Sequence, residues 1–174
     1  MKSAPRTEGH PLRVTSAGGL LLVFLTSACA GASLSRDLLR HDVGRGSRGD
    51  IELVVPEMLI RAGYAIQQRR DTGSLLYYET AWHVREPFDD EKEPCALDCR
   101  SRIIVEARRQ GGQIYSVTLR AENSALEEPA GAQDPASPVW VPLSPSPKFR
   151  EHVRELSAGM EMRIDAGVRV FRSP

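Results

Sequence analysis

The strongest constraint on the fold is a pair of alternating segments in the second half of the chain. Residues 102–109 and 114–122 alternate between apolar and polar side chains, which is the period of a β-strand with one buried face. Between them, Gly111 and Gly112 supply the backbone freedom that a tight turn requires. We therefore predict an antiparallel hairpin with an apolar face that needs a cover and a mixed polar face open to solvent.

A second hairpin is predicted earlier in the chain, where residues 64–69 and 75–84 flank a turn-rich tetrad at 71–74. The face expected to be buried carries four side chains of its second strand: Leu76, Tyr78, Thr80 and Trp82. Before this hairpin, apolar spacing predicts a helix that ends just before Gly63. Pro56 leaves residues 51–55 open between helix and strand, because proline inside a helix removes a hydrogen bond.

A second helix is predicted from Ser146 onward, with that serine as its N-cap and Pro147 at its first position. Phe149, Val153 and Leu156 follow at the spacing of one apolar helix face. The order helix, two hairpins, helix predicts an α+β domain. We expect a two-layer sandwich in which two helices cover one face of a four-stranded antiparallel sheet.

The chain is expected to fall into four parts. Residues 1–28 are predicted to be a signal peptide of the lipoprotein type, and residues 29–49, rich in glycine and serine, a flexible tether. Residues 50–166 would form the α+β domain, with a long loop rich in proline and alanine over residues 123–146. Residues 167–174 are expected to be a tail.

The N-terminal segment has the layout of an export signal. Three basic residues precede the apolar run 20–25, and small residues follow it up to Cys29. The apolar run is far shorter than the ~20 residues that cross a bilayer as a helix. We therefore expect a leader that is removed, and no permanent membrane-spanning helix.

This segment resembles the leader of bacterial lipoproteins, in which small residues stand directly before a cysteine. The resemblance implies that Cys29 becomes the lipid-modified, palmitate-bearing first residue of a protein anchored in the outer membrane and facing the periplasm. Thr26 stands where the usual pattern has leucine. Ordinary cleavage after Ala30 or Ala32, which would give a soluble periplasmic or secreted protein, therefore stays open.

Two further cysteines, Cys95 and Cys99, remain once Cys29 is assigned to the leader or to lipid. An even number of cysteines in an oxidising compartment predicts a disulfide. A competing interpretation joins both cysteines and His83 in a metal or thiol site of an enzyme, although a fourth ligand is not evident.

A second resemblance covers roughly residues 50–122. The run 59–66 ends a predicted helix in Gly-Tyr and enters a strand, and the turn at 71–75 leads to a second strand with Trp82. This arrangement resembles the BamC-like lipoprotein domain of the outer-membrane assembly machinery. The resemblance implies an accessory or scaffolding role in the envelope and carries over no catalytic residue.

Charge excludes one class of partner. The chain holds 23 basic and 23 acidic residues, and the leader takes away three of the former and one of the latter, which leaves a net charge of −2. Nucleic-acid binding is therefore not expected.

Five side chains are predicted to gather on the open face of the sheet as an interaction surface: Arg69, Tyr77, Arg102, Arg108 and Arg120. A salt-bridged, solvated face is the alternative.

The acidic run that includes Asp89, Asp90 and Glu91 lacks the ligand spacing of a calcium loop, so we expect a solvated loop there.

No nucleotide-binding or hydrolase motif is present in the sequence. We therefore expect a membrane-anchored, non-enzymatic scaffolding or protein-interaction domain without a cofactor, with other envelope proteins as partners. A periplasmic module for a lipid or small ligand is the second hypothesis, and the metal or thiol enzyme is the third.

Overall fold

The computed structural model describes residues 39–95, 97–127 and 139–170, and the side chains as far as residue 165. Within these ranges the chain forms seven strands and two helices. In chain order they are β1 (Leu39–Ser47), α1 (Arg48–Arg61), β2 (Ile66–Asp71), β3 (Leu75–Thr80), β4 (His83–Arg85), β5 (Cys99–Gly111), β6 (Ile114–Glu127), β7 (Val139–Pro142) and α2 (Pro147–Val170).

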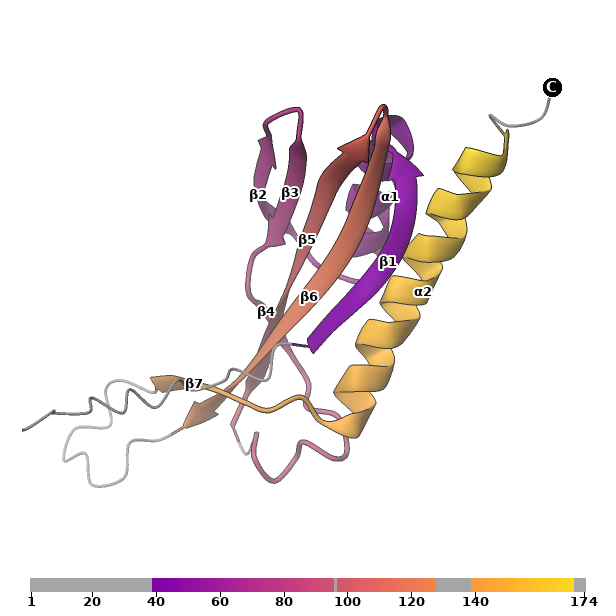
Figure 1. The fold of residues 1–174 in the computed structure, drawn as a ribbon. Helices are drawn as coiled ribbons and strands as arrows, with labels where there is room; N and C mark the ends of the chain where they lie inside the picture. Colours follow the sequence, from indigo (N-terminus) through magenta and orange to yellow (C-terminus); the bar gives the residue numbers. More distant parts are fainter. Residues whose placement is uncertain (1–38, 96, 128–138, 171–174) are drawn as a thin grey trace, which may run out of the picture. The chain divides into compact units, whose positions relative to one another are not determined.

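All seven strands belong to one antiparallel sheet (Figure 1). Its main order is β1-β6-β5-β3-β2, while β4 pairs with β5 and β7 pairs with β6. The α+β class agrees with the prediction, but the four-stranded sheet is wrong. Both predicted hairpins are present as β2–β3 and β5–β6. Of the three additional strands, β4 includes the end of the predicted 75–84 strand, which is interrupted after Thr80, whereas β1 and β7 come from the predicted tether and the predicted loop.

Strand β1 lies where a flexible tether was predicted. Residues 39–47 pair along their length with β6, and only the part of the predicted tether before residue 39 lies outside the described residues. The pairing register shifts between Asp42 and Gly44, and Gly44 has φ 102°. A bulge of this kind breaks the period of two, because one strand gains an extra residue. This break, together with the glycines, concealed the strand in the sequence.

Helix α1 includes Pro56 in its interior and settles residues 51–55 as helix. Its N-terminus is capped by Ser47, whose hydroxyl accepts a hydrogen bond from the backbone N–H of Asp50. Buried apolar residues lie on both sides of the proline, among them Ile51 and Leu59. Their packing offsets the roughly 3 kcal/mol that an interior proline costs a helix.

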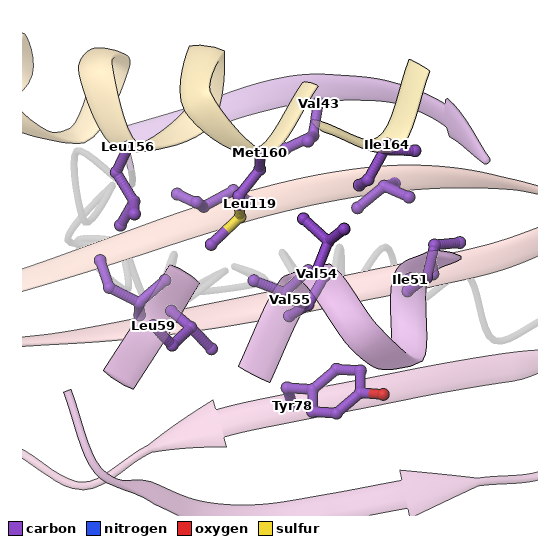
Figure 2. Packing of buried hydrophobic residues seen from close by; sticks show 14 of the residues in the cluster. Val43, Ile51, Val54, Val55, Leu59, Tyr78, Leu119, Leu156, Met160 and Ile164 are labelled. Atoms are coloured by element: carbon purple, nitrogen blue, oxygen red, sulfur yellow. The ribbon is translucent and has the colours of Figure 1, made fainter. Parts of the chain in front are cut away.

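The core lies between one face of the sheet and the two helices. A single cluster of buried side chains includes Val54 and Leu59 of α1, Met160 of α2, and Leu119 and Tyr78 of the sheet. Figure 2 shows these side chains converging from the helices and strands. Figure 1 shows α2 running alongside β1. The sheet thus has one face filled by helices and a second face that no described helix covers.

The long predicted loop and the predicted tail are shorter than expected. Strand β6 continues to Glu127, and β7 adds residues 139–142 to the sheet, so both ends of the predicted 123–146 loop are ordered. Helix α2 continues to Val170, beyond the predicted boundary at 166. Residues 128–138 lie outside the described residues. The content of proline and alanine therefore predicted incorrect boundaries for the loop.

The close packing of β1 on α2 gives a test of the strand that the sequence did not predict. A methyl group at Gly46 would clash with the side chain of Ile164 on α2, whereas one at Gly111 would meet nothing within 4 Å. We expect Gly46→Ala to lower the free energy of unfolding by about 1–3 kcal/mol, because overpacking forces neighbours to move. Urea unfolding of both variants checks this, and equal stabilities of Gly46→Ala and Gly111→Ala would contradict the packing.

Candidate interaction surface on the open face of the sheet

The uncovered face of the sheet carries a lattice of ion pairs. Arg102 on β5 contacts Glu79 on β3 at 2.6 Å and Glu122 on β6 at 2.8 Å. Four residues further along β5, Glu106 contacts both Arg108 and Arg120. Because strand residues two apart lie on the same face, β3, β5 and β6 bring these side chains together across their register.

Ile104 lies within this lattice and is nearly fully buried, although it faces away from the helices. Its direct neighbours across the sheet are Glu79 and Arg120. The carbon stems of long charged side chains cover apolar surface while their charged ends stay near water. The charged lattice therefore replaces a layer of helix over this part of the sheet.

Each of the five residues predicted as an interaction surface has a partner within the chain. Tyr77 donates a hydrogen bond to Glu79, and burial followed by this carboxylate raises the pKa of Tyr77 to about 12. Arg102, Arg108 and Arg120 are held in the ion pairs just described. Arg69 lies on the opposite face, where it contacts Glu52 of α1 at 3.0 Å. Arg69 therefore does not join the other four.

A different group of side chains stands out at one end of this face. The guanidinium carbon of Arg100 lies 4.3 Å from the ring centre of Trp82 and 4.2 Å from that of Trp140. Arg102 also lies over Trp82, at 4.8 Å. We call Trp82, Arg100, Arg102 and Trp140 the tryptophan–arginine cluster. Contacts of this length are cation–π interactions, which hold the arginine side chains in place.

Sheet topology explains how the two tryptophans reach Arg100 from opposite sides. β4 and β7 lie at the two outer edges of the β5–β6 pair, and Arg100 is in register with Val84 of β4 and Ser124 of β6. Trp82 comes directly before β4, whereas Trp140 belongs to β7. The two shortest strands of the sheet therefore deliver the two indole rings.

Arg100 differs from its neighbours because its charge is not matched. No side-chain hydrogen bond or ion pair within the described part of the chain involves Arg100, and its Nε is buried without a partner. Arg120 also has a buried Nε without a partner, but Arg120 is paired with Glu106 through Nη2. Burial, and then the nearby charge of Arg102, lower the pKa of the Arg100 guanidinium. An arginine fixed by two rings and lacking a counter-charge is an arrangement that favours an anionic partner.

The sequence missed this cluster for two reasons. Trp82 was predicted to continue the buried face of its strand, but β3 ends at Thr80 and Trp82 lies half-buried against the arginines. Arg100 was not singled out, although it precedes Arg102 by two residues and so shares its strand face. Extending the period of two backwards from Arg102 would have found it.

The acidic run is a solvated loop only in part, because Asp89 and Asp90 are exposed as expected whereas Glu91 is not. Glu91 is fully buried, and its carboxylate is paired with Arg85 at 2.7 Å and accepts hydrogen bonds from Asn123 and from the backbone N–H of Phe88. The guanidinium carbon of Arg85 lies 4.6 Å from the ring centre of Phe88. This buried ion pair attaches the loop to the sheet, because an unpaired charge there would be very costly.

The two aspartates next to Glu91 hold the start of α2. Asp90 accepts hydrogen bonds from the backbone N–H of Lys148 and from the hydroxyl of Ser146. A carboxylate at a helix N-terminus is favourable because it meets unpaired N–H groups and the positive end of the helix dipole. Asp89 is paired with Lys148 and Lys92, which lower the pKa of Asp89 to about 2. Asp89 and Asp90 thus both have partners within the chain.

Cys95 and Cys99 lie at disulfide distance, with Cα atoms 5.6 Å apart, as predicted. The bridge closes the same loop at the first residue of β5, one position before Arg100. The His83 ring packs against Tyr64, with ring centres 5.4 Å apart. Over the described ranges, no group of three or more His, Cys, Asp or Glu side chains is placed to hold a metal ion, so His83 and the cysteines do not form the competing site.

Comparison with known protein families gives no match to this chain, and comparison with curated proteins gives none either. Cys29 and the whole predicted leader lie outside the described residues. None of the helices described here is both long enough and apolar enough to span a membrane.

The buried ion pair of the loop provides a sharp test. We expect Glu91→Gln to lower the free energy of unfolding by about 3 kcal/mol, because it leaves the Arg85 charge buried and unpaired. The matched control is Glu93→Gln, since Glu93 lies exposed in the same loop, and there we expect a change within about 0.5 kcal/mol. Urea unfolding measures both, and an equally small effect at residue 91 would refute the role of the Glu91–Arg85 pair in attaching the loop to the sheet.

Proposed function

We propose that this chain is an exported lipoprotein, anchored in the outer membrane through Cys29, whose folded domain binds another envelope protein without catalysing a reaction. The observation that carries the binding role is the tryptophan–arginine cluster on the open face of the sheet. Tryptophan and arginine are the residue types most enriched among the dominant contacts of protein interfaces.

Two features support the location. The layout of residues 1–32, with basic residues, a short apolar run and small residues around Cys29, is that of an exported chain. The pairing of Cys95 and Cys99 fits a compartment that is oxidising, since thiols are kept reduced in the cytosol. The two features are independent, because one lies in the leader and the other in the folded domain.

Protein binding is favoured over a ligand held between the layers. The space between the sheet and the two helices is occupied by one continuous cluster of buried apolar side chains. The partly exposed tryptophan and arginine side chains of the cluster lie instead on the opposite face of the sheet. Val84, which is in register with Arg100, is 54% exposed there. A flat face with aromatic and arginine side chains suits another protein surface better than a small molecule.

Lipid attachment is tested by metabolic labelling with palmitate and by intact mass of the purified protein. We expect the label on the wild-type chain, a mature mass that begins at Cys29, and loss of both label and membrane association in Cys29→Ala. A variant with Cys95→Ser and Cys99→Ser should keep the label, since those cysteines lie in the folded domain. Intact protein that still begins at Met1, or that begins after Ala30 or Ala32, would overturn the anchor.

The binding face is tested by a photo-crosslinking amino acid introduced at single positions in intact cells. At Val84, beside the cluster, we expect a discrete adduct with another envelope protein. At Glu155, exposed on α2 and therefore away from the open face, we expect none above background. Adducts of equal yield at both positions, or at Glu155 alone, would contradict the assignment of the face.

A further inference from the structure

We propose that the tryptophan–arginine cluster recognises a single carboxylate side chain on its protein partner, with Arg100 as the residue that pairs with it. This inference rests on the proposed function and adds the chemistry of the partner. Arg100 and Arg102 lie on the same face of β5, two residues apart, but differ in their partners. One has its carboxylates within the chain and the other has none.

Arg102 shows how this face satisfies a guanidinium. It holds Glu79 through Nη1 and Glu122 through Nε, so two carboxylates surround one positive charge. The Nε of Arg100 is buried without a partner, and no carboxylate oxygen in the described ranges lies within ion-pair distance of its guanidinium nitrogens. The two terminal nitrogens of Arg100 are not buried and have no partner in the described ranges, so a carboxylate from outside the chain can reach them.

The two indoles determine how an incoming group can approach Arg100. They reach the guanidinium from opposite edges of the β5–β6 pair, at 4.3 and 4.2 Å. With an indole ring close to the guanidinium carbon on either side and Nε buried, the side chain is left with its two terminal nitrogens for a ligand. A guanidinium edge matches the two oxygens of a carboxylate, and fixing its orientation in advance reduces the entropy lost on binding.

The surrounding charges favour a single carboxylate over a polyanionic surface. Glu79, Glu106 and Glu122 lie on the same face and already neutralise the arginines nearest to Arg100. A lipid layer or a nucleic acid would bring several negative charges against these glutamates, and like charges at short distance are unfavourable. An isolated aspartate or glutamate side chain brings one charge to the one arginine that lacks a partner.

Apolar surface next to Arg100 indicates what should flank that carboxylate. Val84 is in register with Arg100 and is 54% exposed, and Trp82 and Trp140 are both only partly buried. We therefore expect a partner segment in which apolar side chains stand on either side of the acidic residue. Such apolar contacts also exclude water from the ion pair, which strengthens it.

The chain reports on this site through its own fluorescence, because it has two tryptophans in all and both lie in the cluster. The experiment titrates the processed, purified protein with the capped peptide acetyl-Ala-Leu-Asp-Leu-Ala-amide. The same peptide with asparagine in place of aspartate is the matched probe. We expect a saturable change in tryptophan emission with the aspartate peptide and binding weaker by about tenfold or more with the asparagine peptide.

Variants then assign the effect to Arg100. Arg100→Gln should remove the preference for aspartate, because it keeps a planar polar group between the rings but loses the charge. Arg108→Gln is the control on the same face, since Arg108 is exposed and lies outside the cluster, and it should keep the preference. If circular dichroism shows that Arg100→Gln does not fold, the comparison of the two peptides on the wild-type protein decides by itself.

Three results would overturn the inference. They are equal affinity for the two peptides, no saturable change with either, and a change produced equally by inorganic phosphate or by dihexanoyl phosphatidylglycerol below its micelle concentration. The last result would assign the site to phosphate groups and hence to lipid. None of these results would by itself refute the proposed function, because palmitate labelling and crosslinking at Val84 are measured without any peptide.

Discussion

The long antiparallel pairing of β5 with β6 is the interaction on which the rest of the structure depends. These strands have 13 and 14 residues, and every other strand except β2 is hydrogen-bonded to one of them. A period of two along most of both strands separates a mainly apolar face from a mainly polar face. The apolar face requires the cover of α1 and α2, and the polar face is left to satisfy its own charges. A slip of one residue in this register would exchange the two faces and destroy both.

The polar face satisfies nearly all of its charge internally, and this sets the character of any binding there. Exposed ion pairs contribute little to stability individually, but a lattice of them over Ile104 keeps the sheet surface from being either apolar or strongly basic. Against that background, Arg100 is conspicuous as a charge held by two tryptophans and matched by no carboxylate of the described chain. The disulfide and the buried Glu91–Arg85 pair fix the loop that leads into β5, and so support the strand position that carries Arg100.

Sequence reasoning succeeded where local pattern and structure obey the same rule. Both hairpins, the capped second helix and the pairing of Cys95 with Cys99 followed from periodicity, turn residues and cysteine count. It failed where contacts between residues distant in the sequence determine the structure. Strand β1 contains a bulge at Gly44 and is held by α2, more than 100 residues later in the chain. The sequence predicts that Glu91 is solvated, but in the structure its carboxylate is buried against Arg85 and Asn123. The predicted interaction surface contained the paired arginines, because sequence shows where positive charges lie but not which of them find a partner.

The central claim is that Arg100 is held between two tryptophans without a counter-charge, and nuclear Overhauser effects in the free protein test it most directly. The account predicts contacts from the Arg100 side-chain protons to the ring protons of both Trp82 and Trp140. It also predicts that the Nε proton exchanges with water more slowly than that of an exposed arginine, because this atom is buried. Contacts to neither ring, together with exchange as fast as in a free arginine side chain, would contradict the account.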